Sequence, residues 1–127
     1  MAGTLIVSTI GDGNSSKPVA DLLSARIAAR VSFAGNTTPI SIYDSENVSS
    51  ITDLGVGYYQ INFAKPMPNL YYTTVGTAQR TGNYSDIPLS IKSGNSLAQS
   101  TTQVPIVAYD VGGSVIDPLL VSVAIIT

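Results

Sequence analysis

The residues of this sequence that are best suited to chemistry are its eight carboxylates, because the chain contains neither histidine nor cysteine. Without these two residue types, Ser-His-Asp and Cys-His nucleophiles, disulfides and thiolate metal sites are excluded. Asp44 and Glu46 form the nearest acidic pair, and a glycosidase needs two carboxyl groups that flank a cleft. Strands and turns carry such pairs routinely. We therefore expect a protein that is not an enzyme, with a polysaccharide-cleaving enzyme as an alternative.

Three aspartates in predicted turns are candidates for calcium binding. Asp12, Asp110 and Asp117 lie beside glycine, valine or proline, but none of them has the dense D-x-D-x-D ligand spacing of calcium loops. We interpret them as turn residues, whose short side chains bond to the local backbone. Residues 11–13, Gly-Asp-Gly, also lack the Lys-Ser/Thr pair of a phosphate loop. We expect no metal and no cofactor.

Several tyrosines offer a second kind of chemistry, because aromatic rings stack on the CH faces of sugars while amides bind hydroxyl groups. Tyrosines in strands also serve as amphipathic core residues, and this alternative stays open. Gln79 lies near the set in sequence. The candidate glycan-binding residues are Tyr58, Tyr71, Tyr72, Tyr84 and Asn83.

The elements that must position these residues are predicted to be strands. Short β-branched and aromatic runs recur about every 10 to 15 residues between Gly, Pro, Asn, Asp and Ser clusters, which is typical of a sandwich or barrel. We predict an all-β, antiparallel β-sandwich, Ig-like or jelly-roll-like, of eight to nine strands with a short N-terminal arm. Residues 19–30 also have helical spacing, so a short helix is the alternative there. The predicted strands span residues 4–9, 25–33, 39–43, 47–52, 58–63, 70–78, 87–91, 103–109 and 119–126.

Alternation predicts which side chains point inward. Residues 27, 29, 31 and 33 form one apolar face of their strand, and Tyr59, Ile61 and Phe63 form another. The last strand is apolar on both sides, with Val121, Val123 and Ile125 on one side. A strand of that kind lies centrally or is covered by a second subunit. The other side is the candidate subunit interface, formed by Leu120, Ala124 and Ile126.

Composition limits the classes of partner. Of the 127 residues, 44% are apolar and 11% are charged, which predicts an ordered chain. We divide it into an arm with the first strand, residues 1–23, and a sandwich domain, residues 24–127. A net charge of −2 gives no attraction to nucleic acid or to anionic membranes. The start of the chain lacks the pattern of a secretory signal, and no apolar run reaches the length of a membrane span.

One motif is specific enough to suggest a family. Residues 47–63 read NVSSITDLGVGYYQINF and are followed by KPMPN at 65–69 and by Tyr72. This stretch resembles a module of tail-fibre and other virion proteins of tailed bacteriophages, especially cyanophages, whose pattern is N-V-S-S-I-T-D-x-G-x-G-x-Y-x-V-N-F before a Met-Pro turn. Residues 29–33, ARVSF, and 121–125, VSVAI, are similar to two further strands of that module. Arg30 stands where the family has tryptophan and Ile126 where it has phenylalanine, so the role of that tryptophan is not carried over.

The resemblance implies a structural protein of the phage particle, made in the host cytoplasm and located on the virion surface. Our leading hypothesis is a homotrimer of the tail-fibre-like type that recognises a host surface glycan and contacts other virion proteins of the tail. The alternative is a capsid decoration or cement protein that stabilises the head by binding the major capsid protein, with residues 1–23 as its clamp. We expect no shaft before the module, and this expectation favours the alternative. If the resemblance is coincidental, an Ig-like binding module of cellular origin is expected.

Overall fold

The computed structural model of the chain describes residues 3, 9–11, 13, 16–18, 27–80, 89–91, 98–110 and 112–127. All the regular elements in these stretches are strands, so the predicted all-β class is confirmed. None of the described residues belongs to a helix that is long and apolar enough to span a membrane. The strands are β1 (Thr9–Gly11), β2 (Ser16–Pro18), β3 (Ile27–Ala34), β4 (Ser41–Glu46), β5 (Val48–Gly55), β6 (Tyr58–Phe63), β7 (Thr73–Gln79), β8 (Leu89–Ile91), β9 (Gln103–Ala108) and β10 (Leu120–Ile126).

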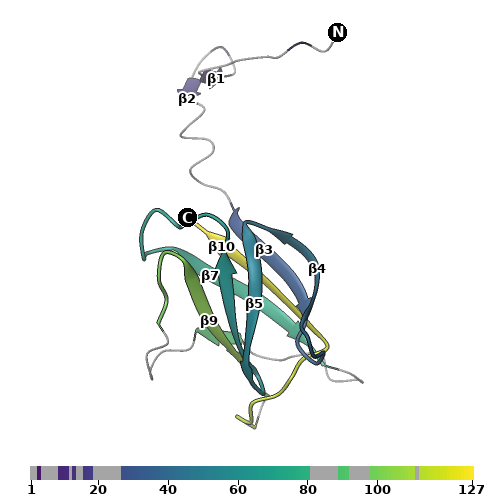
Figure 1. Cartoon of the computed structure of the whole chain (residues 1–127). Helices are drawn as coiled ribbons and strands as arrows, with labels where there is room; N and C mark the ends of the chain where they lie inside the picture. Colours follow the sequence, from purple (N-terminus) through teal and green to yellow (C-terminus); the bar gives the residue numbers. More distant parts are fainter. Residues whose placement is uncertain are drawn as a thin grey trace.

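Two four-stranded sheets form the body of the molecule. Their strand orders are β4-β3-β10-β7 and β5-β6-β9-β8, and every pairing in them is antiparallel. The two sheets lie face to face, which is the predicted sandwich architecture (Figure 1). Among the described strands, β1 and β2 pair with each other and with no other strand. Gly13 has a φ of 94°, a backbone conformation that favours glycine.

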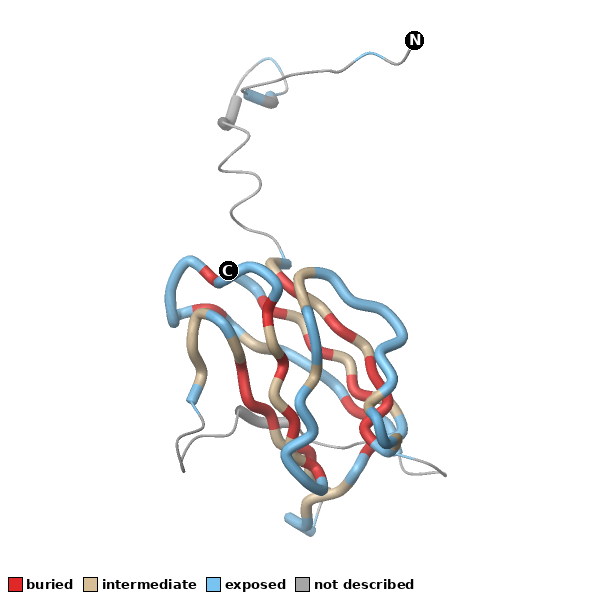
Figure 2. Tube along the Cα trace, viewed as in Figure 1, coloured by how far each residue is buried: buried red, intermediate tan, exposed pale blue. Residues whose placement is uncertain are grey.

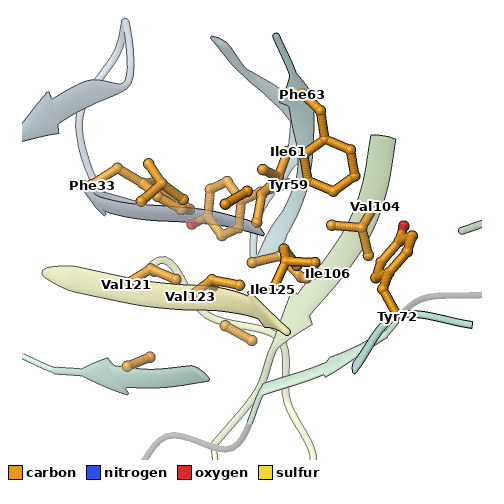
Figure 3. Close-up of a cluster of buried hydrophobic side chains, with 14 of the residues drawn as sticks. Phe33, Tyr59, Ile61, Phe63, Tyr72, Val104, Ile106, Val121, Val123 and Ile125 are labelled. Carbon is orange, nitrogen blue, oxygen red and sulfur yellow. The ribbon is translucent and has the colours of Figure 1, made fainter. Parts of the chain in front are cut away.

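The hydrophobic core lies between the sheets and follows the predicted alternation. Buried and half-buried residues alternate along β6 and β10 (Figure 2). Because successive side chains of a strand point to opposite faces, the buried ones lie on the side of the facing sheet. Phe33 and Tyr59 make an edge-to-face contact at 5.2 Å between ring centroids, and Phe63 and Tyr72 make another at 5.7 Å. Figure 3 shows these rings among the aliphatic side chains of both sheets.

The central place of β10 answers one question that the sequence left open. Its inner residues Val121, Val123 and Ile125 are 0–5% exposed, and both of its edges are paired, with β3 and with β7. A strand that is apolar on both sides therefore lies in the middle of its sheet. Its outer face is half-buried at Leu120 and Ala124.

The structure corrects several details of the strand predictions. Residues 27–30 belong to β3, so a helix does not extend over them, and residues 19–26 lie outside the described part. Ile27, which was expected to face inward, is 50% exposed, because it lies at the end of the strand beyond a register shift against β10. The strand predicted from Leu70 begins only at Thr73, after a loop. Residues 4–8 of the predicted first strand and residues 87–88 also lie outside the described part.

Asn47, the first residue of the motif, holds the two sheets together. It has a φ of 54° in the connection from β4 to β5, and asparagine tolerates this left-handed conformation better than most residues. Its side-chain amide donates to the carbonyl oxygens of Ala28 at 3.0 Å and Lys65 at 3.2 Å, and its Oδ1 accepts from the Lys65 N–H at 2.6 Å. Because Ala28 belongs to one sheet and Lys65 follows β6 of the other, Asn47 fixes how the sheets meet.

Candidate binding surface

The acidic pair that was weighed as a catalytic site is engaged in an ion-pair cluster on the surface. Arg30 of β3 contacts Asp44 of β4 at 2.5 Å and Glu46 of the same strand at 3.5 Å. The hydrogen bond from Arg30 is the main cause that lowers the pKa of Asp44. A general acid in a glycosidase needs the opposite shift. The cluster therefore has a structural role at the outer face of the sheet, and the absence of enzyme activity stays a prediction.

The side chains of the turn aspartates accept hydrogen bonds from backbone N–H groups. Asp110 Oδ1 accepts from the N–H groups of Gly112 at 2.9 Å and Ser114 at 3.0 Å, which closes its turn. Asp117 Oδ1 accepts from the Gly57 N–H at 2.8 Å. Asp12 lies outside the described residues, and in the described stretches no three acidic residues gather as metal ligands. Asp110 and Asp117 thus stabilise loops.

Asp117 also contacts Tyr59, the most deeply buried of the described tyrosines. The hydroxyl of Tyr59 lies 2.9 Å from Asp117 Oδ1 and 2.9 Å from the carbonyl oxygen of Gly35, so that it can donate to either. Burial, and then the neighbouring carboxylate, raise the pKa of Tyr59 above its ordinary value. Three segments far apart in sequence meet at this hydroxyl: the end of β3, strand β6 and the loop before β10.

The five candidate glycan-binding residues are not brought together as one site. Tyr72 is 6% exposed, and its hydroxyl donates to the carbonyl oxygens of Ser100 at 2.8 Å and Gln103 at 3.2 Å. This corrects the prediction for Tyr72, whose ring is part of the core. Tyr58 is half-buried on the outer side of β6, while Tyr71 is 91% exposed. Tyr84 and Asn83 lie outside the described residues.

Tyr71 and Leu70 form an exposed apolar tip, named here the 70–71 tip. Leu70 is 52% exposed and was not among the predicted site residues. The signal that could have found it is its place between the Met-Pro turn and two tyrosines, where a loop presents consecutive large side chains. An aromatic ring that is nearly free of contacts covers much apolar area when a ligand binds it. The 70–71 tip is therefore the leading candidate for a binding contact.

The residues that flank the 70–71 tip hold it in place from both sides. On one side Met67 is 4% exposed and its N–H donates to the Thr101 carbonyl oxygen at 2.7 Å, and on the other Tyr72 is anchored in the core. Within the tip, the Tyr71 N–H donates to Asn69 Oδ1 at 2.8 Å. The Gln99 side chain donates to the Leu70 carbonyl oxygen at 2.8 Å. A contact loop that is already ordered loses little entropy on binding.

The candidate subunit interface lies on the outer face of the sheet β4-β3-β10-β7. Ala124 stands opposite Val75, which is 44% exposed, and Ile126 is 41% exposed. Leu120 lies on the same face, half-buried. A shallow depression crosses this face, lined by Arg30, Ser32, Val75, Thr77, Ser122 and Ala124 among others. The face is apolar enough for an interface, and its use as one stays a prediction.

Comparisons with known proteins add no relative to these observations. No family model, no curated protein and no solved structure matches the sequence. The two surfaces that bear on function are therefore the exposed 70–71 tip and the outer face of the sheet β4-β3-β10-β7.

Proposed function

We propose that this chain is a non-catalytic structural domain of a bacteriophage particle, of the tail-fibre-like type, which is displayed on the virion surface as a homotrimer and contacts a glycan of the host surface. The observation that carries the proposal is that the residues of the motif resembling the virion module hold this fold together. Asn47 bonds both sheets, and Tyr59 fills the core and bonds two loops. A motif whose residues stabilise the core supports a shared fold, and the function of such a protein resides in its surface residues.

Other motif residues support the same interpretation. Asp53 Oδ1 accepts from the Gly55 N–H at 3.0 Å and shapes the turn into β6. Gly57 has a φ of 73°, and a Cβ atom there would lie 2.7 Å from the Ala108 carbonyl oxygen, so no other residue fits without a shift of backbone. The side-chain amide of Asn62 donates to the hydroxyls of Ser50 and Thr52, both at 3.0 Å.

The 70–71 tip is the surface that we assign to the glycan. Tyrosine offers a flat ring to the CH face of a sugar, and its hydroxyl is free to bond a sugar hydroxyl. The tip carries no charge, so the ligand that fits it best is a neutral or weakly charged polysaccharide.

A binding measurement with two matched variants tests this assignment. Tyr71→Ala should weaken binding to purified host envelope polysaccharide by roughly tenfold, the equivalent of one lost stacking contact. Tyr43→Ala is the control, because Tyr43 is 64% exposed on β4, at a different part of the surface. Equal binding by Tyr71→Ala and the unaltered protein would remove the tip from the proposal.

Location and assembly are tested separately. Labelled antibody on intact particles should stain the tail, whereas staining of the head would support the decoration-protein alternative, and no staining of particles would exclude both. Light scattering of the purified protein should give a mass of three chains or a multiple of three. A monomer at micromolar concentration would contradict the homotrimer.

A further inference from the structure

Each sheet of the sandwich has two edge strands, and three of these four edges carry features that oppose pairing with another strand. Strand β4 carries Asp44 and Glu46 and a register shift against β3. Strand β5 carries Asp53 and two register shifts against β6. The described part of strand β8 has three residues. Charges, bulges and short length are the usual means by which proteins prevent edge-to-edge association.

Strand β7 has none of these features. Its seven residues, TTVGTAQ, contain no charge and no proline, and all seven pair with β10 in an unbroken register. Among the described residues, no strand pairs with its other side. Most of the strand is exposed, including Val75, Gly76 and Thr77. A long, regular, uncharged edge leaves a row of backbone N–H and C=O groups, which an extended strand can satisfy.

We propose that β7 pairs antiparallel with β7 of a second copy of this chain, so that two four-stranded sheets become one continuous sheet. The sequence of β7 is suited to pairing with a second copy of the same strand. In a pairing centred on Gly76, Val75 lies opposite Thr77 of the other copy, a favourable pair of β-branched side chains. An acidic or basic partner strand would gain nothing from charge here, because β7 has none.

The nearest charge does not oppose this pairing. Arg80 directly follows β7, and in the Gly76-centred pair the two Arg80 residues lie at opposite ends. Eight residues of strand separate them, which is roughly 27 Å at about 3.4 Å per residue. This separation exceeds the Debye length of about 8 Å at physiological salt, so their repulsion is screened.

The backbone edge of β7 adjoins the outer face assigned to the homotrimer, on which the side chains of Val75 and Thr77 lie, and the pairing does not rest on the proposed function. A two-fold contact joins chains in pairs whatever the outer face does. If the outer face forms trimers, β7 links one trimer to the next. The two assemblies are therefore distinguishable by the number of chains.

Light scattering on the full chain gives the first test. The unaltered protein should have an even number of chains, two without a trimer and six with one. Thr77 lies both at the edge and on the outer face, so Thr77→Lys should leave single chains, whereas Ser122→Lys, which charges the outer face in the middle of the sheet, should leave pairs of chains. Tyr43→Lys on the charged edge β4 should leave the mass unchanged. One or three chains in the unaltered protein, or a mass that Thr77→Lys leaves intact, would overturn the pairing.

Cross-linking gives a second test that does not depend on a destabilised variant. The chain has no cysteine, so single cysteines report one contact each. When Val75→Cys and Thr77→Cys proteins are mixed and oxidised, we expect a disulfide between the two, because residues opposite each other in an antiparallel pair are within reach of one. Ser45→Cys on β4, mixed with either protein, should give none. The proposal would be contradicted if the mixture of Val75→Cys and Thr77→Cys proteins formed no more mixed disulfide than the mixtures that contain Ser45→Cys.

Discussion

Replacing Tyr59 by phenylalanine removes one oxygen atom from the core and leaves the ring in place. The hydroxyl that is lost lies 2.9 Å from both the Gly35 carbonyl oxygen and the Asp117 carboxylate. A hydrogen bond to a charged group contributes about 1.5–3 kcal/mol, and a buried acceptor left without its donor adds to the loss. We expect the free energy of unfolding to fall by about 2–4 kcal/mol. Because typical domains have about 5–15 kcal/mol, the variant should still fold.

Thermal unfolding followed by circular dichroism measures this effect. At about 2.1 cal/mol/K per residue, the 127-residue chain has an unfolding entropy near 0.27 kcal/mol/K. The expected loss therefore lowers Tm by roughly 7–15 °C. Tyr71→Phe is the matched control, since that side chain is 91% exposed and its hydroxyl should contribute almost nothing.

A double-mutant cycle with Asp117→Ala, which removes the acceptor oxygen, isolates the contact itself. If the hydroxyl and the carboxylate act together, the two losses should not add, and the coupling should exceed about 0.5 kcal/mol. The reasoning would be refuted if Tyr59→Phe unfolded at the same temperature as Tyr71→Phe. It would also be refuted if the two losses added fully, because Asp117 would then act only through the Gly57 N–H.

Three further predictions concern other residues that hold the fold. Asn47→Ala should lower the urea midpoint more than Asn47→Gly. Both variants lose the side-chain hydrogen bonds, but glycine adopts the positive φ of residue 47 without strain. Equal midpoints would show that the backbone conformation of residue 47 does not affect stability. Gly57→Ala should destabilise by more than Gly55→Ala, since both have positive φ but only Gly57 has backbone within 3 Å of an added Cβ; the same thermal assay compares them. Burial raises the pKa of Tyr72 from 10.0 to about 12, so the unfolded chain loses this proton first as the pH rises. Stability from this group should be complete below pH 10 and decline between about pH 10 and 12, and Tyr72→Phe should flatten the decline in urea midpoints measured from pH 8 to 12.

Much of the fold could be predicted from local pattern. The alternation of large apolar residues in β6 and β10 predicts strands and identifies their inner faces, because side chains in a strand point to opposite sides in turn. The turn before β6 follows from Asp53 and two glycines, whose positive φ values are 125° and 73°. These features depend on residues that are adjacent in sequence, so the local sequence is sufficient to predict them.

The candidate surface could be predicted only in part. Tyr71 and Tyr72 are adjacent and chemically identical, yet one is 91% exposed and the other 6%. The choice is made by Ser100 and Gln103, whose carbonyl oxygens bind the Tyr72 hydroxyl across 28 and 31 residues of chain. The contact between Tyr59 and Asp117 spans 58 residues in the same way.

What the sequence determined by itself is therefore the class of fold, the inward faces of its strands and the turns between them, because these arise from the two-residue period and from backbone preferences. Only the tertiary structure decided which tyrosine is exposed, which carboxylates are bound and which strand is left as an open edge. These properties depend on the order and register of strands in the sheets, and that order brings together residues whose separation in the chain carries no local pattern.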